Sequence, residues 1–295
     1  MITFLRNWML PIAMFAGIIF YSFFSRLTAV TPYLIFSMLF LTFSKLSPKE
    51  LKFRKLHFKL LAMQLGMAAT GWLIFACFNT DLANSALICF LAPTATAAAV
   101  VTGLLGGSVP FITGYVFLTN AVVAISAPFL FSYIGEMTDL PFHSSVWLIC
   151  KEVIPLLILP LLSAWAIRFT SPKALNYIQS LHGLSLYIWA FALMIVVGKT
   201  VNYLIHQDKP DYLLEILIAL ISLTTCCLQF ALGRWIGRKE NETITGGQSL
   251  GQKNTILAIW LSHMYINPLV AIAPATYVLW QNCINSYQLW KKRRN

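Results

Sequence analysis

The chain has little charge, and acidic residues are the scarcest charged type. Only 11% of its 295 residues are charged, and Asp and Glu together number 10. A soluble protein carries about 25% charged residues. Hydrophobic residues make up 58% of the chain, and the mean hydropathy is +0.73. This composition excludes an ordinary soluble domain and predicts a polytopic, all-α membrane protein.

Patterns that indicate a cofactor, a metal site or an enzyme are also missing. The 6 cysteines lie in or beside apolar runs without metal-ligand spacing, which indicates structural thiols. The histidines near the ends of apolar runs have no acidic partner in the sequence around them. The net charge of +11 does not require a nucleic acid, because basic loops on one membrane face produce the same excess. We therefore predict no enzyme activity, cofactor, metal or nucleic-acid partner.

Apolar windows long enough to cross about 30 Å of hydrocarbon predict ten transmembrane helices joined by short loops. The first window is interpreted as a span and not as a signal peptide, because no small-residue cleavage site follows it. The windows are 7–25, 28–45, 59–79, 84–106, 109–134, 146–168, 180–200, 212–235, 245–264 and 268–289.

The distribution of charge predicts the orientation of these spans. Basic residues concentrate at 45–59, 234–239 and 291–294, which an even number of spans places on one side of the membrane. Asp81, Asp208 and Asp211 then fall on the other side. Because loops rich in Lys and Arg stay inside, we expect both termini in the cytoplasm of a bacterial inner membrane, with membrane lipids as contacts. A monomer is compatible with the sequence, which leaves the oligomeric state open.

Two halves of five spans each would form an inverted repeat, because five is an odd number. The first repeat would cover residues 1–134 (spans 1–5) and the second residues 146–295 (spans 6–10). Pro110 in span 5 and Pro268 in span 10 are offset by 158 residues, and the same offset relates Thr96 in span 4 to Asn254 in span 9.

Spans 4 and 9 are rich in small and polar residues near their centres. Span 4 contains 92-APTATAAAVVTGLLGG-107, in which Pro93 has no N–H and should interrupt the helix. Span 9 contains 246-GGQSLGQKNTILAIW-260, in which Gly246, Gly247 and Gly251 should weaken it. Paired interrupted helices at matching positions indicate the binding site of a transporter. For span 4 alone, close helix packing by small residues remains an alternative.

Lys253 is the unusual residue of span 9, because no acid lies deep in any predicted span. A cation near the bilayer centre costs at least about 2.5–3.5 kcal/mol on insertion scales. Its ammonium could be hydrogen-bonded by carbonyls of an interrupted helix and by Asn or Thr side chains. It could instead attract an anionic substrate or act as a proton site. The simpler alternative is that Lys253 extends to the inner membrane face.

At these residues the chain resembles the bile acid:sodium symporter family, a group of ten-helix carriers. The family's span 9 pattern, Glu-x-Gly-x-Gln-Asn-x-x-Leu-Ala, is matched at Gly251, Asn254, Leu257 and Ala258. Its span 4 pattern, Pro-Gly-Gly-Thr-Ala-Ser-Asn-Val-Val-Thr, is matched at Pro93, Thr96, Ala97, Val100, Val101 and Thr102. Gln64 in span 3 resembles a Gln that the family often has there.

The resemblance implies a panel domain of spans 1, 2, 6 and 7 and a core domain of spans 3–5 and 8–10. In the core, spans 4 and 9 would cross at their unwound centres beside the substrate, and organic anions would be taken up with sodium. Residues implied at the substrate and crossover site are Gln64, Pro93, Thr94, Thr96, Thr102, Asn120, Gly251, Gln252, Lys253, Asn254 and Thr255.

The sequence departs from this family at the sodium ligands. Ser249 stands where the family has a sodium-binding Glu, and Lys253 where it has a sodium-binding Gln. Ala98 and Ala99 align with a Ser-Asn pair, and Asn120 aligns with a hydroxyl residue. We therefore expect a degenerate ion site at Ser249, Lys253, Ala98 and Ala99.

This pattern predicts a sodium-independent secondary transporter for an organic anion, such as a bile-acid-like or pantothenate-like carboxylate. Lys253 would stand in place of the ion. Alternatives are a sodium-coupled symporter with altered ligands, a receptor-like relative that does not transport, and a carrier of the same superfold with another cargo. An arsenite carrier is disfavoured, because the nearest Cys in span 4 is Cys89, four residues before Pro93.

Overall fold

A computed structural model describes residues 9–48, 51–135 and 141–294. Within these ranges the chain is helical and contains no β-strand. In the part of the chain that the structure describes, five helices are long and apolar enough to cross a membrane, as expected for a helical membrane protein. They are α5 (Lys55–Ala76), α8 (Val109–Ile134), α9 (Phe142–Thr170), α11 (Leu184–His206) and α12 (Tyr212–Arg238). The count of ten spans and the inverted repeat stay predictions.

The chain forms two compact units. Unit 1 comprises residues 1–45 and 154–211, and unit 2 comprises residues 46–153 and 212–295. In unit 1, α11 packs against three shorter helices near the start of the chain. These are α2 (Met9–Ile19), α3 (Tyr21–Ser25) and α4 (Thr31–Phe43). Unit 1 also contains α10 (Pro172–Ser180), a helix that the sequence did not predict.

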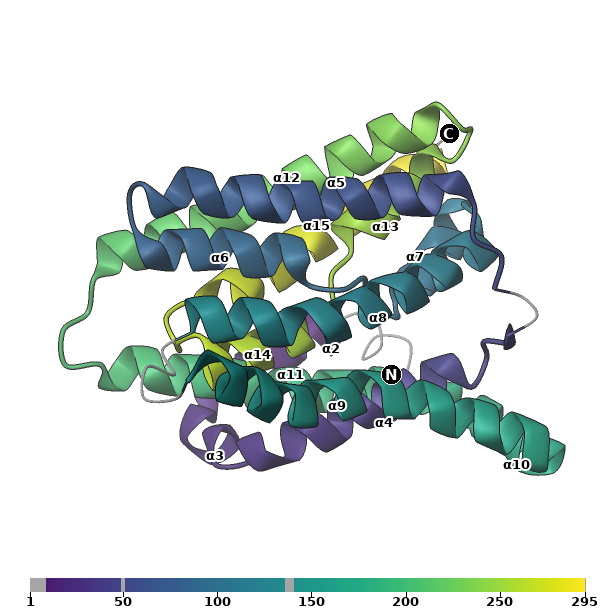
Figure 1. Ribbon diagram of the computed structural model, residues 1–295, viewed down its shortest axis with the longest axis horizontal. Helices are drawn as coiled ribbons and strands as arrows, with labels where there is room; N and C mark the ends of the chain where they lie inside the picture. The colour runs from purple at the N-terminus through teal and green to yellow at the C-terminus, as the bar shows by residue number, and fades with distance from the viewer. Residues whose placement is uncertain (1–8, 49–50, 136–140, 295) are drawn as a thin grey trace. The chain divides into compact units, whose positions relative to one another are not determined.

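Unit 2 contains the interrupted helices (Figure 1). The predicted span 4 is divided into α6 (Thr80–Leu91) and α7 (Ala98–Leu105). The predicted span 9 is divided into α13 (Thr243–Gly251) and α14 (Thr255–Tyr265). Helix α15 (Ile272–Arg294) ends the described chain and packs against α6, α12 and α14.

The glycines of α13 have a different role from the predicted one. Gly246 and Gly247 lie inside a continuous helix that extends to Gly251, so they do not interrupt it. A Cβ atom on Gly246 would collide with the carbonyl oxygen of Gly233 in α12. These glycines therefore allow the backbones of α12 and α13 to approach closely, which is the usual role of small residues between membrane helices.

Candidate functional site

The interruption of the first helix pair begins just before Pro93. Helix α6 ends at Leu91, and Ala92 adopts φ −43° and ψ 135° in place of a helical conformation. The ring of a proline disfavours the helical conformation at the preceding residue, and the missing N–H removes one helical hydrogen bond. Pro93 and Thr94 are buried, whereas Thr96 is partly exposed. Helix α7 resumes at Ala98, with Ala99 in its first turn.

The second interruption follows Gly251. Gln252, Lys253 and Asn254 are not helical, and α14 begins at Thr255. A side chain at Gly251 would collide with the Phe230 ring of α12, so the backbone can take this position only without one. Asn254 caps α14, because its Oδ1 accepts a hydrogen bond from the Leu257 N–H at 3.3 Å.

The two interrupted segments pair with each other. The Ala95 N–H donates to the Gln252 carbonyl at 2.9 Å, and the Asn254 N–H donates to the Pro93 carbonyl at 2.8 Å. Thr94 and Lys253 thereby form an isolated antiparallel bridge. We call residues 92–97 and 252–254 the junction. Inside a bilayer, non-helical backbone must find partners within the protein, and this pairing supplies them.

Lys253 lies buried at the junction and contacts the end of α6. Its side chain is 1% exposed, so it does not extend to a membrane face. Its Nζ donates to the carbonyl of Phe90 at 2.9 Å. None of the ion pairs among the described residues involves Lys253. The carbonyl end of a helix carries partial negative charge, which favours a cation there when no acid is present.

Thr94 makes the reciprocal contact. Its Oγ1 donates to the carbonyl of Ser249, in the last turn of α13, at 2.7 Å. Its own N–H donates to Thr119 Oγ1 of α8 at 3.1 Å. Each interrupted segment therefore supplies a side chain that satisfies a terminal carbonyl of the other interrupted helix. The side chain of Ser249 itself is buried, and its hydroxyl has no partner.

Gln64 of α5 also satisfies the end of α6. Its Nε2 donates to the carbonyls of Leu91 and Ala92 at 3.1 and 3.2 Å. Its Oε1 accepts a hydrogen bond from the Tyr115 hydroxyl at 3.1 Å. The side chain is 1% exposed. Gln64 is therefore fixed in place by both of its polar atoms and positions the backbone next to the junction.

Helix α15 supplies polar residues that the sequence interpretation missed. Tyr277 donates to the Gly251 carbonyl at 2.8 Å, and Gln281 Oε1 accepts from the Lys253 N–H at 2.9 Å. Asn285 Nδ2 donates to Gln252 Oε1 at 2.8 Å. Because these residues are spaced by four, they share one face of the helix. That spacing was present in the sequence and could have indicated a polar stripe facing span 9.

Two of the described residues predicted for the site, Asn120 and Thr102, form no side-chain hydrogen bond with the junction. The Asn120 amide donates to Val116 of its own helix α8 at 2.8 Å, and its Oδ1 is buried without a partner. Thr102 lies within α7, where its carbonyl accepts from the Gly107 N–H at 2.8 Å. The role of the remaining predicted residues in substrate binding stays a prediction. Across residues 9–48, 51–135 and 141–294, no group of three or more His, Cys, Asp or Glu is placed to hold a metal ion.

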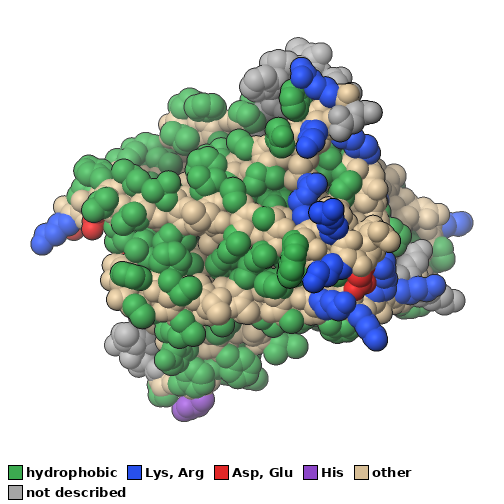
Figure 2. Space-filling view, turned by 90° about the horizontal axis from the view of Figure 1, so that it is seen from above, with side chains coloured by type: hydrophobic (Ala, Val, Ile, Leu, Met, Phe, Trp, Pro, Cys, Tyr) green, Lys and Arg blue, Asp and Glu red, His purple; other side chains and the backbone are tan. Residues whose placement is uncertain are grey.

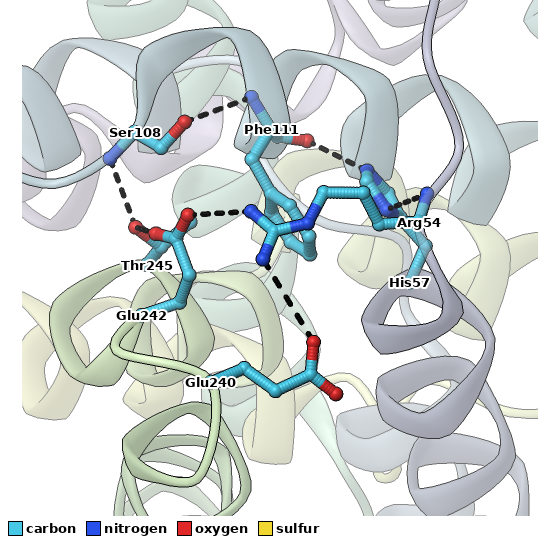
Figure 3. Close-up of polar contacts among 7 residues, drawn as sticks. All are labelled: Arg54, His57, Ser108, Phe111, Glu240, Glu242 and Thr245. Carbon is cyan, nitrogen blue, oxygen red and sulfur yellow. Dashed lines mark hydrogen bonds and ion pairs between the residues drawn. The ribbon is translucent and has the colours of Figure 1, made fainter.

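A second polar network joins the starts of α5, α8 and α13 (Figure 3). Arg54 donates to Glu242 at 2.8 Å and lies 3.8 Å from Glu240. Glu242 accepts from Thr245, whose Oγ1 also accepts from the Ser108 N–H at 2.9 Å. The network includes the following further contacts: Phe111 N–H to Ser108 Oγ, His57 Nε2 with Phe111 O, and Arg54 N–H to His57 Nδ1.

Glu240 belongs to this network through a second cation as well. Lys59 Nζ lies 2.7 Å from its Oε1. This hydrogen bond, together with the positive charges of Lys59 and Arg54, lowers the pKa of the Glu240 carboxyl.

No known protein family and no curated protein sequence matches this chain.

Proposed function

We propose that this protein is a secondary transporter of an organic anion that works by alternating access without sodium. The observation that carries the proposal is the pairing of Thr94 with Lys253 at the junction, where the lysine is buried and has no acidic partner among the described residues. In transporters, paired interrupted helices mark the binding site for substrate and coupling ion.

The polarity of the helices at the junction favours an anion. Both α7 and α14 begin directly after the paired segments, so the positive ends of their dipoles lie at the junction. Thr96 and Asn254 are partly exposed there, unlike the buried Thr94 and Lys253. Exposed backbone N–H groups at a helix start bind carboxylates readily. A bile-acid-like or pantothenate-like carboxylate fits this arrangement.

The chemistry of Lys253 argues against a sodium ion at the same place. Sodium sites are built from oxygen ligands, and the ammonium already occupies the Phe90 carbonyl at 2.9 Å. A cation a few ångströms from Nζ would be repelled more strongly here than in water, because the surroundings have a low dielectric constant. In the proposed mechanism the ammonium does the work of a bound ion and keeps α6 joined to the segment after α13.

The division of the chain into units supports an alternating-access mechanism. Unit 2 contains the junction, and unit 1 contains residues 1–45 and 154–211. These segments correspond to a core and a panel in the proposal. Alternating access would expose the junction to each side of the membrane in turn.

The proposal is tested by the melting temperature of detergent-purified protein, measured in the presence of each of a panel of organic anions that includes bile acids and pantothenate. Each anion is measured in sodium chloride and in choline chloride, with wild type and Lys253→Gln. We expect one class of anion to raise the melting temperature equally in both salts, and the variant to lose this response. Stabilisation by sodium itself would overturn the sodium-free mechanism and favour sodium symport.

Uptake by proteoliposomes separates a transporter from a receptor-like relative. The anion that stabilises the protein most is supplied with radioactive label outside vesicles that contain the same anion unlabelled. We expect exchange in choline chloride, and none in vesicles that carry Lys253→Gln. Binding without exchange in wild type would contradict transport and leave the receptor-like alternative.

A further inference from the structure

Basic residues gather at one end of unit 2, and the hydrogen bonds of the structure show that several helix ends meet there. The start of α5 is joined to the end of α12 through Arg54, Lys59 and Glu240. The end of α15 is joined to the end of α7, because Lys292 Nζ donates to the Leu104 carbonyl at 3.0 Å. Figure 2 shows most of the Lys and Arg side chains in view toward one end, a few at the opposite end, and hydrophobic side chains over much of the face between them.

Two acids among the described residues near this end, Glu240 and Glu242, already form ion pairs. Arg54 pairs with both Glu240 and Glu242 in the network of Figure 3. Lys59 pairs with Glu240 as well. Six further basic side chains of unit 2 are exposed and form no ion pair within the described part of the chain. We call these residues the basic rim: Lys52, Lys55, Arg238, Lys239, Lys291 and Arg294. Among the described residues, no acidic side chain is paired with the rim.

Two members of the rim lie over exposed tryptophan rings. Lys239 Nζ is 4.4 Å from the centre of the Trp235 ring, and Arg294 Cζ is 4.2 Å from the centre of the Trp290 ring. Trp235 is 55% exposed and Trp290 is 49% exposed, so both rings lie on the surface of the protein. Tryptophan prefers the depth of lipid headgroups, and a neighbouring cation extends from it toward the phosphates. The same pairing of a cation with a tryptophan occurs near the ends of both α12 and α15.

We infer that the basic rim binds the headgroups of anionic phospholipids. The occupant follows from charge complementarity and from the tryptophans, because a soluble anion would gain nothing from aromatic rings at headgroup depth. Phosphate oxygens accept hydrogen bonds from Lys and Arg, and anionic lipids attract basic clusters that flank membrane helices. This inference is independent of the proposed transport activity.

A lipid-binding assay on the full-length protein in detergent tests it, with fluorescent phosphatidylglycerol and phosphatidylcholine of the same chain length. We expect wild type to prefer phosphatidylglycerol by roughly tenfold or more, as several uncompensated cations predict. The triple variant Lys239→Gln, Lys291→Gln, Arg294→Gln should lose most of this preference. Equal binding of both lipids by wild type, or full binding by the variant, would overturn the inference.

Lys151→Gln is the matched control. Lys151 also lies over a tryptophan, with Nζ 5.1 Å from the centre of the Trp147 ring. The next residue, Glu152, accepts a hydrogen bond from the hydroxyl of Tyr265. Tyr265 is the last residue of α14, which leads away from the junction, so Lys151 lies at the end of unit 2 opposite to the rim. We expect this variant to bind phosphatidylglycerol like wild type. An equal loss in the control would mean that any exposed lysine suffices, which contradicts a defined rim.

Two measurements on wild type alone do not depend on whether the triple variant folds. Raising sodium chloride from 50 to 500 mM should weaken phosphatidylglycerol binding and leave phosphatidylcholine binding unchanged, because salt screens exposed charges. Inorganic phosphate at millimolar concentration should not displace the lipid. Displacement by phosphate would identify a site for free anions and overturn the lipid assignment.

Discussion

The Nζ of Lys253 donates a hydrogen bond of 2.9 Å to the carbonyl oxygen of Phe90, and this bond joins the second interrupted helix to the end of the first. The partner bond runs in the other direction, from Thr94 to the Ser249 carbonyl at 2.7 Å. Together with two backbone hydrogen bonds, these contacts join the two interrupted segments, and none of the ion pairs among the described residues takes part.

Replacing Lys253 by Met should destabilise the protein. The bond to Phe90 is lost and a buried carbonyl is left unpaired, which costs about 1–2 kcal/mol between membrane helices. The measurement is the melting temperature in detergent without substrate.

Lys292→Met is the control for this variant. Lys292 also donates to a terminal carbonyl, that of Leu104, but its side chain is exposed. Water can replace its bond, so we expect a change of less than about 0.5 kcal/mol. If Lys253→Met were as mild as Lys292→Met, the ammonium would not be holding the junction.

Thr94→Val keeps the shape of the side chain and removes its hydroxyl. The Ser249 carbonyl then loses its partner in a buried site, and we expect a loss of about 1–2 kcal/mol. Thr94→Ser should retain most of the stability. Thr96→Val lies in the same segment but is partly exposed, so it should have little effect on the melting temperature. Equal losses for Thr94→Val and Thr96→Val would contradict a specific role for the Thr94 hydroxyl.

Gly246→Ala should destabilise the pairing of α12 with α13. Its added methyl group would meet the Gly233 carbonyl, and such overpacking costs about 1–3 kcal/mol. The control is Gly66→Ala in α5, where a Cβ atom would have no neighbour within 4 Å. Because Ala is the better helix former, this control should leave the melting temperature unchanged or raise it. A tolerated Gly246→Ala would mean that the two helices can separate without loss.

The ion pair of Glu240 with Lys59 should make stability depend on pH. The folded state lowers the pKa of Glu240 below its ordinary value of 4.5, so the stabilisation is present above pH 4.5 and is lost as the pH falls through the folded pKa. The melting temperatures of wild type and Glu240→Gln should therefore differ slightly at pH 7 and converge at lower pH.

Lys59→Gln provides the check on this assignment. It should produce a similar small loss at pH 7, and the double variant should lose no more than either single change. High salt should reduce all of these effects, because the pair is exposed. Additive losses in the double variant would show that the two residues act separately.

Part of the site could be predicted from the sequence because its cause is local. Pro93 favours an interruption, since it lacks an N–H and restricts the residue before it. Proline alone does not decide the matter, because Pro128, Pro155 and Pro160 lie inside continuous helices. An apolar chain with so few acids also leaves a lysine in span 9 without an obvious acidic partner. The glycines of span 9 were different. Gly246 and Gly247 remain in a helix, where they allow close packing against α12. The residues of the predicted span 9 alone do not show that α12 is the neighbouring helix.

The sequence alone determined the helical membrane character of the protein, the position of the first interruption and the isolation of Lys253 from acids. These follow from composition and from backbone chemistry within a few residues. Only the tertiary structure decided that Lys253 bonds to Phe90 and Thr94 to Ser249, and that Gln64, Gln281 and Tyr277 satisfy the surrounding backbone. A non-helical segment inside a membrane needs hydrogen-bond partners, so the sequence shows that partners must exist. The partners are far apart in the chain, and only the packing of the helices decides which residues they are.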